Sequence, residues 1–223
     1  MENVYIDGDL LIHRCAWNNT INGLKKKALD LIDDIMHETQ ATNGKIAIGG
    51  KDNFRKTLYP EYKANRKKEQ DPEVKELFSE GYKFLIEELE AIPATGQEAD
   101  DLLAIWCTEE PGIIVSIDKD MLQVPGMHFN NAKWEYKTME EEECNYLLHK
   151  QILTGDSSDN IKGLPGIGPK KAEAILSGRG KDLRKTVCKA WKENYGKGWE
   201  DDLQLNTDLI YLRRKFDDRY LIV

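Results

Sequence analysis

The chain has 223 residues, 40% of them hydrophobic and 32% charged, and its formal net charge is −8. These values are typical of a water-soluble globular protein with one large domain or slightly more. No apolar run is long enough to cross a membrane and the N-terminus lacks a signal-peptide pattern, so we expect a cytoplasmic protein without membrane association. The four cysteines and four histidines show no zinc-site spacing. The net charge argues only weakly against a nucleic-acid partner, because the local distribution of charge decides.

Apolar segments with two different periodicities alternate along the first half of the chain. Short runs bounded by turn residues predict buried strands at 4–7, 45–50 and 112–118. Amphipathic patterns predict helices at 22–40, 71–89 and 97–110. Strands that alternate with helices indicate an α/β fold with a mostly parallel sheet.

The strand pattern fades after about residue 140, and the rest of the chain has the pattern of short helices. We therefore expect an α/β core at 1–139 and a helical subdomain at 140–223. The acidic run at 135–143 is interpreted as a solvated face.

Acidic residues occur where predicted strands end or predicted helices begin. They are Asp7, Asp9, Glu98, Asp100, Asp101, Asp118, Asp120, Asp156 and Asp159. Each group has an ordinary alternative, since acids favour helix N-termini and turns. However, ligands of parallel sheets bind at the carboxyl ends of the strands, so these segments could deliver acid to one edge. Crowded carboxylates stay ionised only beside cations, and a set of oxygen ligands indicates Mg²⁺ or Mn²⁺. Two such ions, about 3.5–4 Å apart, suit in-line attack on a phosphodiester.

A basic stretch at 51–68 interleaves cationic and aromatic side chains. This combination is typical of a surface that follows a nucleic-acid backbone and stacks on bases, although a solubilising loop is the alternative. We expect DNA contacts from Arg55, Lys56, Tyr62, Lys63, Arg66 and Lys67.

The segment 163–176, GLPGIGPKKAEAIL, resembles a helix–hairpin–helix turn. Its glycines would let backbone N–H groups approach a phosphate, and a helix N-terminus that follows also favours anions. We expect it to hold a DNA backbone without reading bases, through Gly163, Gly166, Gly168, Lys170 and Lys171.

Five motifs together resemble the 5′-nuclease family: flap endonucleases, the 5′-nuclease domains of bacterial DNA polymerase I, and phage 5′–3′ exonucleases. They occur in family order: DGD (7–9), FRKTLYPEYKANR (54–66), EADDLLA (98–104), DKD (118–120) and GDSSDNIKGLPGIGPKKA (155–172). The resemblance implies a PIN-like α/β core followed by a helix–three-turn–helix element. It implies Mg²⁺-dependent cleavage of DNA near the junction of a duplex and a 5′ single strand, in replication or repair. We accordingly expect a monomer in a bacterial or phage-infected cell.

The resemblance also implies roles for individual residues. The first metal cluster would comprise Asp7, Glu98, Asp100 and Asp118. The second would comprise Asp120, Asp156 and Asp159, and Asp101 matches a further family acid. Lys63 and Arg66 match residues of the arch region, here about 51–90, that steer the scissile phosphate; with Asp7 and Asp118 they are the expected catalytic residues. The turn from Gly163 to Gly168 would hold the duplex, often with a monovalent cation such as K⁺.

One feature departs from the family pattern. The family usually has an aspartate at the end of the second strand, where this chain has Gly49 and Gly50. Asp9 or Asp52 could take its place. The departure keeps open a DNA-binding protein with weak or absent catalysis. Asp7, Asp9 and the GDSSDN loop also loosely match a haloacid-dehalogenase-like phosphatase, and a PIN-type ribonuclease is a third alternative.

Overall fold

The computed structural model describes residues 2–16, 20–66, 71–178 and 182–223, and the chain forms two compact units. Unit 1 comprises residues 1–53, 67–139 and 213–216. Unit 2 comprises residues 54–66, 140–212 and 217–223. Each unit is therefore built from segments that are distant in the sequence. Within the described residues, none of the helices is both long and apolar enough to cross a membrane.

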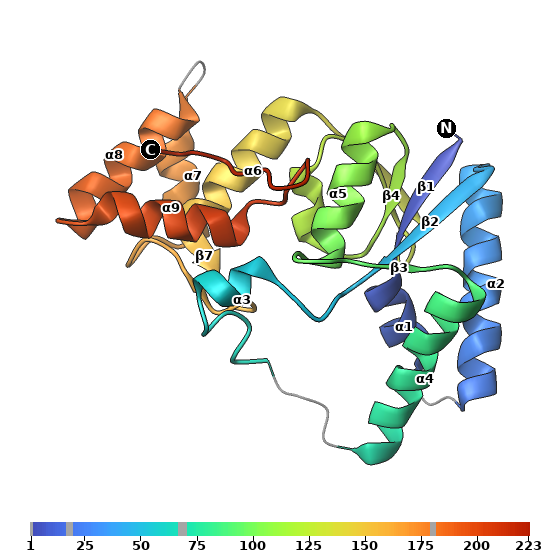
Figure 1. The fold of residues 1–223 in the computed structure, drawn as a ribbon. Helices are drawn as coiled ribbons and strands as arrows, with labels where there is room; N and C mark the ends of the chain where they lie inside the picture. Colours follow the sequence, from blue (N-terminus) through green and yellow to red (C-terminus); the bar gives the residue numbers. More distant parts are fainter. Residues whose placement is uncertain (1, 17–19, 67–70, 179–181) are drawn as a thin grey trace. The chain divides into compact units, whose positions relative to one another are not determined.

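Unit 1 contains a six-stranded sheet (Figure 1). Its strands are β1 (Asn3–Asp7), β2 (Asn43–Ile48), β3 (Ile92–Pro93), β4 (Ile113–Val115), β5 (Gly126–Asn130) and β6 (Glu135–Met139). The order across the sheet is β3-β2-β1-β4-β5-β6. Every neighbouring pair is parallel except β5 and β6, which are antiparallel. This arrangement confirms the predicted mostly parallel α/β sheet.

Helices cover both faces of this sheet (Figure 1). They are α1 (Gly8–Ala16), α2 (Ile21–Thr39), α4 (Pro72–Glu88) and α5 (Ala99–Glu109), with a 3₁₀ helix η1 (Lys119–Gln123). Val4 and Ile6 belong to the same buried cluster as residues of α1, α2 and α4. Successive side chains of a strand point to opposite faces, so Tyr5 faces the other way. Its ring lies 6.0 Å from that of Trp106 on α5.

Unit 2 is mainly helical (Figure 1). Its elements are α3 (Phe54–Leu58), α6 (Glu141–Thr154), β7 (Gly155–Asp156), β8 (Ile161–Lys162), α7 (Pro169–Leu176), α8 (Leu183–Tyr195) and α9 (Trp199–Ile210). The β7–β8 hairpin and the glycine turn connect α6 to α7. A separate core around Trp191, which is 2% exposed, holds the helices together. The predicted C-terminal helical region is therefore present.

The predicted strands and helices of the first 118 residues are all present within a few residues of their expected ends. Five elements of unit 1 were not predicted from the sequence: α1, β3, η1, β5 and β6. The run at 135–143 is exposed except for Met139, as expected for a solvated face; its first half is the edge strand β6 and its second half begins α6. β6 alternates weakly because four of its five residues are exposed.

Candidate active site

The order of the strands places a topological switch point in unit 1. From β1 the chain proceeds outward to β2 and β3, then returns on the other side of β1 to β4, β5 and β6. Ligands of open parallel sheets bind at the carboxyl ends of the strands at such a point. Asp7 is the last residue of β1, and Asp118 follows β4, the parallel neighbour of β1. Two of the predicted acids therefore lie at the position where this fold binds ligands.

Ser116 connects these two aspartates. Its Oγ donates a hydrogen bond to Asp7 Oδ2 at 3.0 Å and accepts one from the Asp118 N–H at 3.0 Å. Asp118 Oδ1 in turn accepts the Asp120 N–H at 2.8 Å, which fixes the first turn of η1. The sequence analysis missed Ser116. A polar residue at the end of an otherwise apolar buried strand was the available signal.

The carboxylates of unit 1 influence one another electrostatically. Burial raises the pKa of Asp7 to about 6, and the neighbouring charges of Asp9 and Asp118 add to this shift. Burial also raises the pKa of Asp9, which is partly offset by a hydrogen bond from Gly49 and increased by Glu98. Asp7, Asp9, Asp118 and Glu98 thus share one region of negative charge. A cation bound there would favour their ionised forms.

The start of α5 separates three acids that the sequence pattern grouped together. Glu98 is the N-cap residue, and Asp100 lies in the first turn with partial exposure. Asp101 is fully buried: its Oδ2 accepts the Glu98 N–H at 3.0 Å and its Oδ1 accepts the Arg213 N–H at 3.0 Å. Both oxygens therefore bind backbone donors. This placement corrects the expectation for Asp101, which stabilises the start of the helix and the segment around Arg213.

The donor chemistry of unit 1 fits a hard divalent cation. Asp7, Asp9, Glu98, Asp100 and Asp118 offer only oxygen ligands, which Mg²⁺ and Mn²⁺ prefer. Among the residues that the structure describes, no three His, Cys, Asp or Glu side chains are already gathered as one ligand set. Mg²⁺ keeps several waters and needs only one or two carboxylates, so a closed protein cage is not required.

Two further predicted acids belong to unit 2. Asp156 Oδ1 accepts hydrogen bonds from the Ser158 N–H at 2.7 Å and the Ser158 hydroxyl at 2.5 Å. Asp159 accepts a hydrogen bond from the Tyr62 hydroxyl at 3.0 Å. It also forms ion pairs with Arg66 and with Lys63, whose Nζ lies 3.6 Å from Oδ2. Unit 2 thus brings together Asp159 and both cations expected to act on the scissile phosphate.

Two residues of the basic stretch are in the core of unit 2 and are corrections to the expected DNA surface. Arg55 is 1% exposed, and its guanidinium donates to Leu209 O at 2.9 Å and Tyr211 O at 2.7 Å. Tyr62 is 3% exposed. Neither side chain is accessible for phosphate or base contacts. Lys56 is exposed as expected, and Lys67 lies outside the described residues.

The three glycines of the predicted phosphate-binding turn differ in their backbone conformation and in the space around them. A Cβ on Gly163 would lie 2.2 Å from the carbonyl carbon of Thr154, so this glycine permits close packing of two backbone segments. Gly166 has φ +74°, a conformation that favours glycine. Gly168 is exposed, caps α7, and has open space around it. Lys170 and Lys171 are both exposed, and Lys171 Nζ donates to Gly166 O at 2.9 Å.

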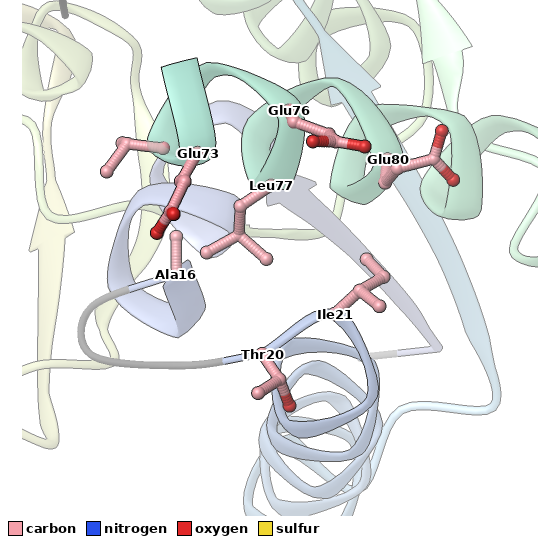
Figure 2. A pocket seen from close by; sticks show the side chains of 8 residues that line it. Ala16, Thr20, Ile21, Glu73, Glu76, Leu77 and Glu80 are labelled. Carbon is pink, nitrogen blue, oxygen red and sulfur yellow. The ribbon is translucent and has the colours of Figure 1, made fainter. Parts of the chain in front are cut away.

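A hollow of about 460 Å³ lies elsewhere in unit 1, between the end of α1, the start of α2 and the first turns of α4 (Figure 2). Leu77 points into it from α4, opposite Ala16 and Ile21. Eight residues line this hollow. They include Glu73, Glu76 and Glu80, and none of them is basic. None of these residues lies at the carboxyl end of a strand, where ligands of an open parallel sheet bind, so the acidic strand ends remain the better candidate site.

Residues 3–149 match the family described as 5′-3′ exonuclease, N-terminal resolvase-like domain. The chain belongs to this family. The family match supports the resemblance noted in the sequence motifs and argues against a haloacid-dehalogenase-like phosphatase.

Individual relatives agree with this family. The chain is 32% identical over 184 residues to the flap endonuclease Xni of Shewanella woodyi, covering 74% of this chain and 71% of that protein. It is 31% identical over 188 residues to DNA polymerase I of Rhizobium leguminosarum, covering 72% of this chain but only 18% of the polymerase.

Solved structures share the fold of this 5′-3′ exonuclease family member. The phage T5 5′-exonuclease, solved with bound zinc ions, has a TM-score of 0.70 at 20% identity and covers 93% of this chain and 89% of its own. Human GEN1, solved with Holliday junction DNA, has a TM-score of 0.55 at 16% identity and covers 93% of this chain and 57% of its own. Both likenesses support the PIN-like architecture.

Proposed function

We propose that this 5′-3′ exonuclease family member is a structure-selective 5′ nuclease that hydrolyses DNA phosphodiesters with the help of divalent cations. The observation that carries the proposal is the Asp7–Ser116–Asp118 hydrogen-bonded chain at the switch point of the sheet. It combines oxygen-only ligands, shared negative charge and the ligand-binding edge of the fold. The family match and the flap endonuclease relatives support the choice of DNA as substrate.

In unit 1 we propose Asp7, Glu98, Asp100, Asp118 and Asp120 as ligands. Asp156 and Asp159 of unit 2 are proposed as ligands on the resemblance of the GDSSDN motif to the 5′-nuclease family alone. When bound, two Mg²⁺ or Mn²⁺ ions would supply an activated water near neutral pH and neutralise charge on the leaving 3′-oxygen. Ser116 holds Asp7 and orders the backbone at Asp118, so it acts as a positioning residue.

Lys63 and Arg66 are proposed to stabilise charge on the scissile phosphate. Their ion pairs with Asp159 restrict the positions of both cations, which supports this role. Asp159 would then have two functions, as a ligand and as the residue that orients both cations.

The glycine turn is proposed to hold the duplex portion of the substrate. Gly166 and Gly168 leave their backbone open, and Lys170 lies exposed at the start of α7. Backbone N–H groups and a helix N-terminus favour a phosphate, and backbone carbonyls of the turn suit K⁺. Gly163 is left out of this interface because it serves backbone packing. We retain the expectation of a monomer that acts in the cytoplasm of a bacterial or phage-infected cell.

Cleavage of a 5′-labelled flap duplex, mapped at nucleotide resolution with Mg²⁺ or with EDTA, tests the proposal. We expect Mg²⁺-dependent products near the junction, with a 5′-phosphate and a 3′-hydroxyl. Asp156→Asn should cripple cleavage and spare DNA binding.

One observation favours a second candidate: the missing acid at Gly49 and Gly50 is compatible with a DNA-binding protein that does not cleave. Binding of the flap without any Mg²⁺-dependent product would select that alternative. Cleavage of a matched RNA in preference to DNA would select the PIN-type ribonuclease.

A further inference from the structure

The end of β2 carries no acidic side chain of its own, yet a carboxylate lies there. The Gly49 N–H donates to both oxygens of Asp9, each at 3.1 Å. A Cβ on Gly49 would lie 2.9 Å from Asp9 Oδ2. The carboxylate of Asp9 therefore occupies the volume into which a side chain at position 49 would extend.

Two other glycines explain how the Asp9 carboxylate can lie where a side chain at position 49 would extend. A Cβ on Gly8 would lie 2.6 Å from Ile48 Cγ2 and 2.8 Å from Ala47 O, so α1 starts in direct contact with β2. This contact places the next residue, Asp9, beside the end of that strand. A Cβ on Gly50 would lie 1.7 Å from Ala94 O, so position 50 has no room for an acid. Position 49 is thus the only one of the two whose side-chain space the protein could use.

A second contact holds Asp9 in this place. The Tyr82 hydroxyl, on α4, lies beside the Asp9 carboxylate and acts to lower its pKa. Tyr82 is partly buried, and its helix packs on α1 and α2 within unit 1. Asp9 also interacts electrostatically with Asp7 and Glu98, which belong to the proposed metal centre. The carboxylate therefore faces the same region as the other ligands.

We propose that Asp9 is a divalent-cation ligand that replaces an acid at the end of β2, and that Tyr82 is the residue that positions it. Gly49 is a glycine because the Asp9 carboxylate fills its side-chain space. This inference rests on the proposed function, because it assigns a further ligand to the same centre. Asp52, the other candidate substitute, is exposed in the loop beyond Gly50 and serves as the control.

A relocation experiment tests the proposal directly. Binding of Mn²⁺ alone is measured by the loss of the free-ion EPR signal in wild type, Asp9→Ser, the double variant Asp9→Ser/Gly49→Asp, and Asp52→Asn. Asp9→Ser should weaken Mn²⁺ binding about 10-fold or more, in the range seen when groups around a metal are removed. The double variant should return to within about threefold of wild type, since the new carboxylate enters the space that serine vacates. Asp52→Asn should bind as wild type does.

The outcomes separate the possibilities. Unchanged Mn²⁺ affinity of Asp9→Ser would overturn the ligand role, and failure of the double variant to recover would overturn the replacement at position 49. If Asp9→Ser does not fold, Asp9→Asn keeps an oxygen acceptor for Gly49 and is used instead. Because Mn²⁺ binding is measured without DNA, wild-type protein that binds Mn²⁺ as described but cleaves no flap would reject the proposed nuclease while leaving the ligand assignment intact.

The role of Tyr82 has its own test. Tyr82→Phe keeps the ring in place and removes only the hydroxyl. We expect a several-fold loss of Mn²⁺ affinity, smaller than that of Asp9→Ser, with an unchanged melting temperature in EDTA. A changed melting temperature with wild-type Mn²⁺ affinity would show that the hydroxyl serves packing alone.

Discussion

Substitution of Arg55 tests whether this residue contacts DNA or stabilises the core of unit 2. Its guanidinium donates to the carbonyl groups of Leu209 and Tyr211, at the C-terminal end of α9, where carbonyls lack helical partners. A hydrogen bond that involves a charged group contributes about 1.5–3 kcal/mol. Arg55→Ala removes two of them and leaves both acceptors without these donors. We expect unit 2 to lose about 3–5 kcal/mol of stability.

The assay compares Arg55→Ala with Lys56→Ala, the exposed neighbour on the same helix. For a protein of this size, about 3–5 kcal/mol corresponds to a fall in melting temperature of about 10 °C. Lys56→Ala should melt as wild type does and should weaken binding of a flap duplex at low temperature. A melting temperature of Arg55→Ala within 2 °C of wild type, roughly the effect of 1 kcal/mol or less, together with weakened DNA binding, would refute the structural assignment.

Three further predictions concern charge and backbone. Since the pKa of Asp7 rises from 3.8 to about 6 on folding, the metal-free protein should lose about 3 kcal/mol of stability as the pH rises from about 4 to about 6. Asp7→Asn in EDTA should therefore be more stable than wild type at pH 8 and equal to it near pH 4 by urea unfolding; equal stability at both pH values would contradict this. Gly163→Ala should lower the melting temperature, because its Cβ meets the Thr154 backbone. Gly168→Ala should keep the wild-type melting temperature and weaken duplex binding. If Gly168→Ala binds the duplex as tightly as wild type does, Gly168 does not belong to the interface. DNA affinity should fall steeply with salt despite the net charge of −8, and an affinity insensitive to salt would exclude a phosphate-tracking surface.

The fold of unit 1 was largely readable from the sequence because its strands and helices carry strong periodicities. β1 and β4 are buried apolar runs, and α2 and α4 have caps at Thr20 and Asp71. α1 escaped because it begins directly after β1, where an aspartate and a glycine normally indicate a turn. β6 escaped because an edge strand with an exposed face has little apolar pattern. β5 escaped because Gly126, His128 and Asn130 interrupt its apolar residues.

The acidic residues of the candidate site could be predicted from the sequence, but their burial and their hydrogen-bond partners could not. The spacing of Asp7 and Asp118 relative to strand ends was sufficient to place both at one edge. Residue type alone could not distinguish Asp101, whose two oxygens bind backbone N–H groups, from the partly exposed Glu98 and Asp100 near it. Burial depends on contacts between segments that are distant in the sequence, as between Arg55 and α9. Charged residues were therefore assigned to the surface when the fold uses them inside.

The role of Asp9 also could not be predicted from residue type alone. The glycines at 49 and 50 indicated a lost ligand, and the sequence left both Asp9 and Asp52 open as substitutes. The contact between Gly8 and β2 and the hydrogen bonds from Gly49 distinguish them, because they place one carboxylate at the strand end. A missing residue in a motif can thus be balanced by another that is close in space.

The acidic strand ends of unit 1 are proposed to be the catalytic metal centre. The most direct test is the single-turnover rate of flap cleavage by Asp7→Asn at pH 8 and saturating Mg²⁺. We predict a fall of about 100-fold or more relative to wild type, with DNA affinity unchanged, since a lost ligand removes stabilisation of charge in the transition state. A rate within about threefold of wild type, a difference below 1 kcal/mol in the barrier, would contradict the claim.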